Sequence, residues 1–154
     1  MAGGIAWRAE EPLLSRRPSS PMRAAEYAVR GHEGAELTVF HFGTGQGGSV
    51  DDNVQRWVGQ FTQPGGGSSA DVAQIDRQQI NGFDVTTVDV RGTYSAMSAG
   101  GASSGPREGQ RLLGAIVEAP QGMVFFKLTG SEEAVAEAEA AFGALLRSVR
   151  ATSH

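Results

Sequence analysis

The chain has 154 residues, of which 40% are hydrophobic and 19% charged, and its formal net charge is −4 at pH 7. This length favours one domain that can bury a core without a metal or a disulfide. The acidic balance argues against a general nucleic-acid binder and against a polybasic membrane patch. Because the sequence contains no cysteine, thiol catalysis, disulfides and thiolate metal sites are excluded.

No apolar run approaches the ~18 residues that a membrane-spanning helix requires. The opening MAGGIAW has no basic segment followed by an apolar stretch, so we expect no signal peptide within the sequence as it stands.

The first third of the chain is expected to form strands. A short strand is predicted over residues 4–7, followed by an irregular connector over about 8–21 that contains three prolines. The segments 22–31 and 35–43 have strong β character and are close enough in sequence to pair as a hairpin.

A first helix is predicted by apolar residues at helical spacing. These residues are Val54, Trp57, Val58 and Phe61. Ser49 or Asp51 can cap the helix, and acidic residues in its first turn suit the positive end of the helix dipole.

A glycine run precedes this helix, with Gly43, Gly45 and Gly48 in the letter pattern of a dinucleotide-binding turn. The pattern is informative only where the helix leads into a parallel strand. Here the chain leads into a hairpin, and Asp51 and Asp52 place negative charge where a phosphate would bind. We therefore interpret the run as a turn, and we expect no cofactor.

Two hairpins follow. Asn81-Gly82 is the preferred pair for a type I′ turn, with arms over residues 72–80 and 83–94. A flexible loop is expected over about 95–109, because this segment is small and polar without periodicity. The second hairpin turns near residues 120–122, and its strands are apolar at nearly every position, so they should lie centrally with both faces covered.

The closing segment predicts a long helix capped by Ser131, with Glu132 and Glu133 in its first turn. Its expected buried stripe comprises Val135, Ala138, Phe142, Leu145, Leu146 and Val149. The order of elements predicts one α+β domain over residues 1–154, with a mostly antiparallel sheet of about six to seven strands and two main helices.

No catalytic, cofactor or metal site is predicted. His32, His41 and His154 lack a second histidine or a carboxylate at metal-ligand spacing. Asp84 and Asp89 fall on opposite faces of one strand, so they do not form a catalytic pair.

The candidate contact residues flank the glycine- and serine-rich loop. They are Arg91, Tyr94, Arg107 and Arg111. Arginines beside an aromatic residue at the ends of two strands can hold a carboxylate, a phosphate or an acidic partner. The alternative is that they only solubilise the loop.

Three segments together carry a resemblance to a known superfamily. They are NVQRWVGQF, INGFDVTTVDVRGTY and the closing segment over residues 112–150. Over residues 7–149 the sequence resembles the PsbP-like fold, which is shared by an extrinsic subunit of photosystem II, a nuclear-import factor that binds a small GTPase, and many small bacterial proteins. It most resembles uncharacterised bacterial lipoproteins of this fold.

The resemblance implies a non-enzymatic binding or assembly module, exported behind a leader that ends in a lipidated cysteine. Such a leader, and its lipid anchor, would precede the present sequence. The expected location is therefore extracytoplasmic, with a protein or cell-envelope partner and no nucleic acid. A cytoplasmic location is one alternative. A small-ligand-binding protein or small enzyme, with a pocket beside the glycine-rich loops, is another, and the oligomeric state is open, since an edge strand can pair with its copy.

Overall fold

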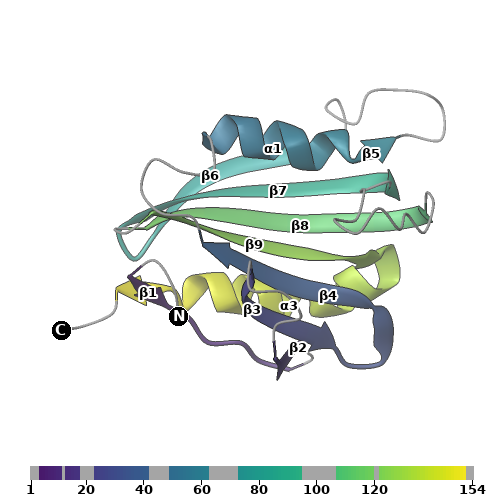
Figure 1. The fold of residues 1–154 in the computed structure, drawn as a ribbon, viewed down its shortest axis with the longest axis horizontal. Helices are drawn as coiled ribbons and strands as arrows, with labels where there is room; N and C mark the ends of the chain where they lie inside the picture. Colours follow the sequence, from purple (N-terminus) through teal and green to yellow (C-terminus); the bar gives the residue numbers. More distant parts are fainter. Residues whose placement is uncertain are drawn as a thin grey trace.

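The computed structural model describes residues 4–11, 13–17, 23–41, 49–62, 73–94, 107–119 and 122–151. Its elements in chain order (Figure 1) are β1 (Ile5–Ala6), β2 (Leu13–Arg16), β3 (Arg23–Val29), β4 (His32–His41), α1 (Val50–Gly59), β5 (Phe61–Thr62), β6 (Gln74–Ile80), β7 (Phe83–Tyr94), β8 (Arg107–Ala119), β9 (Gly122–Ser131), α3 (Glu132–Arg147) and β10 (Arg150–Ala151).

The main sheet has the strand order β2-β3-β4-β9-β8-β7-β5, and β6 also pairs with β7. Strands β5 and β6 occupy the same edge of β7, at its Thr93–Tyr94 end and its Phe83–Asp89 end. All pairs among the described strands are antiparallel, and β1 and β10 form a separate two-stranded sheet. The predicted α+β fold with two helices is confirmed.

The two helices cover opposite faces of the sheet (Figure 1). Strand β8 shows why, because its buried side chains alternate between two cores. Leu112 and Ile116 belong to the cluster under α1, whereas Leu113 and Val117 belong to the larger cluster under α3. The prediction that this strand is central and covered on both faces is confirmed.

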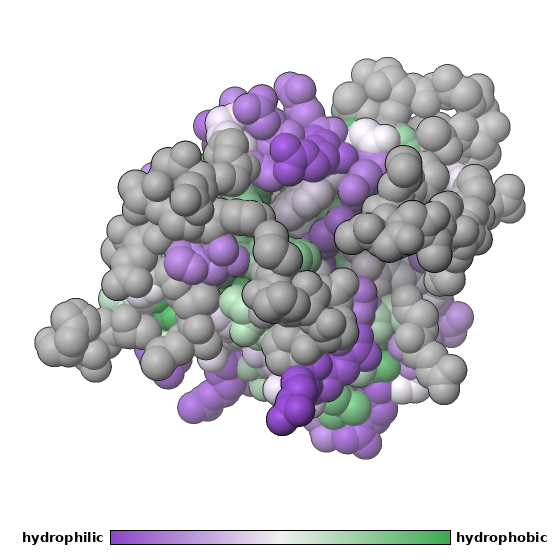
Figure 2. Space-filling view, viewed as in Figure 1, coloured by the Kyte–Doolittle hydropathy of each residue, from purple (hydrophilic) through white to green (hydrophobic). Residues whose placement is uncertain are grey.

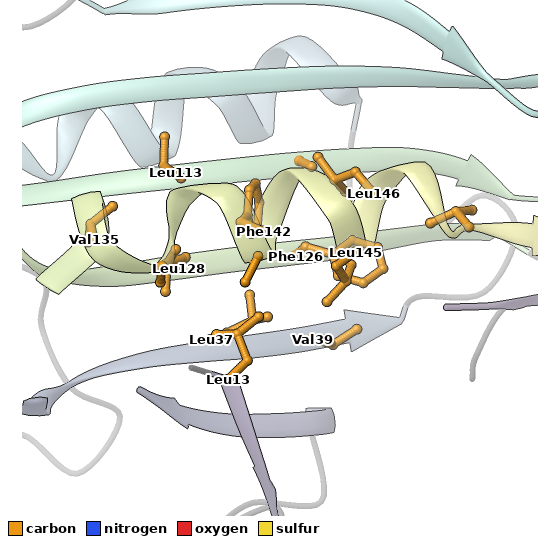
Figure 3. Close-up of a cluster of buried hydrophobic side chains, with 14 of the residues drawn as sticks. Leu13, Leu37, Val39, Leu113, Phe126, Leu128, Val135, Phe142, Leu145 and Leu146 are labelled. Carbon is orange, nitrogen blue, oxygen red and sulfur yellow. The ribbon is translucent and has the colours of Figure 1, made fainter. Parts of the chain in front are cut away.

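Helix α3 closes the larger core. The Oγ of Ser131 accepts a hydrogen bond of 3.1 Å from the backbone N–H of Ala134, which confirms the predicted cap. All six residues of the predicted stripe are buried, but the helix ends at Arg147, so Val149 reaches the core from beyond the helix. In Figure 3, Phe142, Leu145 and Leu146 of this helix lie over side chains of β4, β8 and β9. This packing, rather than helix propensity, supplies most of the helix's stability.

Helix α1 is capped by Ser49, whose Oγ accepts a 3.0 Å hydrogen bond from the N–H of Asp52. Val54, Trp57 and Val58 are buried as predicted. The helix ends at Gly59, so Phe61 reaches the same core from β5 instead of from the helix. The outer face of α1 is hydrophilic (Figure 2).

The Asn81-Gly82 turn is confirmed as a hairpin, with φ angles of 52° and 87°. Trp7 fixes the start of the chain to the sheet, since its Nε1–H donates to the hydroxyl of Tyr27 at 3.0 Å and its ring meets Phe126 edge-on at 5.0 Å.

Two expected boundaries are corrected. The connector over about 8–21 contains strand β2, because its residues add antiparallel to β3 between Pro12 and Pro18. The loop over about 95–109 is shorter than expected at its end, because β8 begins at Arg107 and continues the ladder with β7. The glycine run at 43–48 lies outside the described residues.

Candidate functional site

The β7–β8 ladder brings the four sequence-predicted contact residues to one end of the sheet. Arg91 pairs with Arg111 in register, and Tyr94 pairs with Arg107. For Tyr94 and Arg107, the structure describes the position of the backbone. Their grouping is therefore a consequence of hairpin register, which sequence spacing alone did not fix.

Arg111 is buried, with 4% of its side chain exposed. Its Nε and Nη2 donate to the two carboxylate oxygens of Asp89 at 2.9 and 2.6 Å, and its Nη1 lies 3.0 Å from an oxygen of Glu139. Hydrogen bonding to Asp89 raises the pKa of Arg111. The two-pronged pair with Asp89 joins β8 to β7, and the ion pair with Glu139 joins β8 to α3, so Arg111 serves the packing of the helix on the sheet.

Arg91 is more open to an external group. Its Nη1 lies 3.6 Å from an oxygen of Glu132, and both side chains are about half exposed. Such an exposed pair contributes little to stability and exchanges readily with other partners. A role for Arg91, Tyr94 and Arg107 in holding an anion or acidic group stays a prediction.

A second feature is strand β6, which is not among the contact residues predicted from the sequence. Six of its seven residues are exposed, and they lie on both faces of the strand. Its residue Ile75, 47% exposed, is the one exposed large hydrophobic side chain in the part of the chain that the structure describes. No described strand pairs with the outer edge of β6.

Natural edge strands are usually shortened, bulged or provided with proline or lysine to prevent pairing with other chains. Edge strand β2 follows this rule: it has four residues, lies between Pro12 and Pro18, and its Arg16 is ion-paired with Glu26 and Glu36. Strand β6 does not: it pairs with β7 over seven residues without a register shift and has neither proline nor lysine. The β6 edge is therefore the less protected of the two.

A groove lies on each side of β6. Towards α1, a groove of about 680 Å³ is lined by Asp51 of the helix and its cap Ser49, Arg77 of β6, Asp84 of β7 and Glu118 of β8, among others. The side chain of Arg77 reaches across it, with Nη2 2.7 Å from an oxygen of Asp51.

Towards α3, a groove of about 400 Å³ is lined by Gln74 and Asp76 of β6 and by Glu139 and Arg147 of the helix, among others. The two grooves show that neither helix closes onto β6. Within the described residues, no group of three or more acidic or histidine side chains could hold a metal ion. No described helix has the length and apolar character to cross a membrane.

The sequence offered one signal for this edge. Five of the seven residues of β6 are polar, and they fall on both faces of the strand. A strand inside a sheet that carries a helix on each face should be apolar on both sides, as β8 is. Polar residues on both faces are thus the pattern of an edge strand.

Comparison with known proteins supports the fold. No protein-family model and no curated protein matches the sequence. The structure is similar to that of cyanobacterial PsbP (CyanoP) from Synechocystis sp. PCC 6803, with a TM-score of 0.53 and 11% identity over 99% of this chain and 95% of that chain. It also matches the protein of unknown function PA94 from Pseudomonas aeruginosa, with a TM-score of 0.48 and 12% identity over 100% and 87% of the two chains.

At 11% identity the similarity to CyanoP concerns the fold alone. The chain therefore has a PsbP-like fold, as the sequence segments around the Asn81-Gly82 hairpin and the last helix predict.

Proposed function

We propose that this protein is a non-enzymatic binding or assembly module that takes up an extended segment of a partner protein along β6. The observation that carries the proposal is the unprotected edge: a regular seven-residue strand, exposed on both faces, with the exposed Ile75 upon it. An added strand gains main-chain hydrogen bonds from such an edge, and its alternate side chains contact the two flanking sides.

We further propose that the protein acts outside the cytoplasmic membrane, attached to a protein or cell-envelope partner. The support is the resemblance of its sequence to exported bacterial lipoproteins. Arg91, Tyr94 and Arg107 are proposed as a secondary contact for an acidic group of that partner, with Arg111 holding the underlying strands on α3.

Site-specific photo-crosslinking in the native host tests the edge. A photoreactive residue at position 75, on β6, should give one crosslinked product of defined mass. The matched control is position 15, an exposed residue of the protected edge strand β2, which should give no such product. Equal products from both positions, or none from position 75, would reject the edge as the binding surface.

The location has its own test. Fractionation of the native host should place the protein in the envelope fraction, accessible to protease once the outer layer is permeabilised. Complete recovery in the cytosol would reject the extracytoplasmic proposal without deciding anything about β6.

A second candidate function is a small-ligand-binding protein or small enzyme. The groove of about 680 Å³ favours it, because polar side chains of α1, β6, β7 and β8 converge there. A thermal-shift screen with nucleotides, phosphorylated metabolites, sugars and divalent metals tests it. A ligand present at 100 times its Kd should stabilise the fold by about 2.7 kcal/mol. A flat screen would reject this candidate and leave the partner-binding module.

A further inference from the structure

We infer that the segment received by β6 is basic on its α1-facing side, with an apolar residue four positions from a lysine or arginine. This inference rests on the proposed function, since it names the chemistry of the partner at the same edge.

The first step is the division of β6 into two sides. Ile75 pairs with Val88, Arg77 with Thr86 and Gln79 with Asp84 in the ladder with β7. Paired residues share a face of a sheet, and Val88 belongs to the core under α1. Ile75 and Gln79 therefore lie on the α1 side, at the two ends of one row.

The second step is the charge along that row. Arg77, in its middle, is ion-paired with Asp51 at 2.7 Å, so these two charges offset each other. Near the Gln79 end, Asp84 accepts a hydrogen bond of 3.0 Å from Gln79, and Glu118 lines the same groove. No arginine, lysine or histidine of the described residues forms an ion pair with Asp84 or Glu118. Among the side chains that the structure describes, this end of the row has a net negative charge.

The other side of β6 gives no such preference. There Asp76 and Arg147 line one groove and carry opposite charges, while the remaining carboxylates, Asp89 and Glu139, are held by Arg111. A preference for partner segments of one charge is therefore expected only on the side of β6 that faces α1.

The third step converts this row into a pattern. An added strand places its side chains opposite those of β6, at about 3.3 Å per residue. An apolar side chain opposite Ile75 is then about 13 Å, or four residues, from the side chain opposite Gln79. At that position, Asp84 lies two strand spacings away, about 10 Å, which the long side chain of lysine or arginine can bridge.

A second copy of this protein is a poor occupant of the edge. Antiparallel self-pairing about the centre of β6 would place Arg77 opposite its own copy, and like charges directly opposite are destabilising. A different chain with basic residues fits better.

The test uses synthetic nine-residue peptides with blocked ends and the folded protein labelled with ¹⁵N. The basic probe is TTVTTTKTT and the acidic probe TTVTTTETT, each also made in reversed order so that either strand direction is available. Chemical shift changes in the amides of residues 74–80 report binding. The basic probe should bind β6 about five- to tenfold more tightly than the acidic probe at low ionic strength, and the difference should shrink in 0.5 M salt.

A variant pair identifies the charges. The double variant Asp84→Asn, Glu118→Gln should lose the preference for the basic probe, since both side chains are exposed and their replacement should leave the fold intact. The control Glu10→Gln, Glu133→Gln makes the same change in net charge at exposed residues that line neither groove, and should keep the preference.

The outcomes separate the two proposals. Equal binding of both probes to β6 would overturn the basic-partner inference while leaving the edge as the binding surface. Absence of shifts at residues 74–80 with every probe at millimolar concentration would overturn both. Concentration-dependent dimers by light scattering that disappear in Ile75→Lys would overturn the inference in favour of a second copy.

Discussion

The ring of Trp57, on α1, lies directly on Gly114 of β8. A Cβ placed on Gly114 would be 2.4 Å from Cζ3 of Trp57, closer than two carbon atoms can approach. The same indole meets Phe125 of β9 edge-on, with ring centroids 6.1 Å apart. The absence of a side chain at Gly114 therefore allows α1 to dock on the central strands.

This contact predicts the effect of a single methyl group. Gly114→Ala should lower the free energy of unfolding by about 1–3 kcal/mol, because the indole has to move away from the sheet. The control is Gly59→Ala at the end of α1, where a Cβ would meet no atom within 4 Å. That change should be neutral or stabilise by up to about 1 kcal/mol. Urea unfolding followed by circular dichroism compares the two, and equal effects would contradict the packing role of Gly114.

Arg111 should be far more important for stability than its neighbour Arg91. Arg111→Met leaves Asp89 and Glu139 near the sheet without their cation, which should cost about 2–4 kcal/mol. Arg91→Met acts at an exposed side chain paired with the exposed Glu132, and should cost less than about 1 kcal/mol. Denaturant midpoints of both variants measure the difference. A loss of the same size in both would show that Arg111 does not tie the sheet to α3.

The pKa of Arg111 also predicts a pH profile. Because hydrogen bonding to Asp89 raises this pKa, the stabilisation is fully present below the unfolded-state pKa. It would be lost only as the pH rises through the folded-state pKa, far above the physiological range. The stability difference between wild type and Arg111→Met should therefore stay constant from pH 7 to pH 9. A steep change within that interval would contradict it.

The hydrogen bond between Trp7 and Tyr27 can be separated from the packing of the indole. Trp7→Phe keeps a ring over Phe126 but removes the donor, and should cost about 0.5–1.5 kcal/mol. Trp7→Ala removes both and should cost about 2–4 kcal/mol, since the side chain is half-buried. Tyr27→Phe combined with Trp7→Phe should add little to either single change, because both remove the same bond. Full additivity would show that the bond contributes nothing.

Asn81 has two roles that two substitutions distinguish. Its φ of 52° lies in the left-handed region, and its side-chain amide donates to the carbonyl of Val149 at 2.6 Å. Asn81→Gly keeps the backbone conformation but loses the side-chain bond, at a cost of about 0.5–1.5 kcal/mol. Asn81→Ala loses the bond and adds backbone strain, so it should cost about 1–2 kcal/mol more than glycine. Thermal unfolding compares them, and equal losses would exclude strain at the turn.

The periodicity of the sequence predicts a local feature well where one apolar stripe or one turn pair dominates. The stripe of α3 and the Asn81-Gly82 turn are confirmed because helical spacing and positive φ are properties of a few adjacent residues. The prediction that Phe61 belongs to the first helix is wrong, because Phe61 continues the helical spacing although the helix ends at Gly59. Its burial was predicted, but not the strand from which it reaches the core.

The sequence predicts less of the candidate site than of the fold. Arg111 is paired with a carboxylate 22 positions before it and another 28 positions after it, and the sequence holds no sign that these three meet. The exposure of β6 is likewise not evident from the sequence, because it depends on how far α1 and α3 extend over the sheet.

The period of each element, the hairpin turn at Asn81-Gly82 and the apolar character of both faces of the central strands can be read from the sequence, because they follow from backbone geometry and neighbouring side chains. Three further features follow from the packing of the elements: α1 and α3 cover opposite faces of the sheet, Arg111 is buried between β7 and α3, and β6 forms an exposed edge. These features depend on contacts between residues that are far apart in the sequence, so no local pattern of residues indicates them.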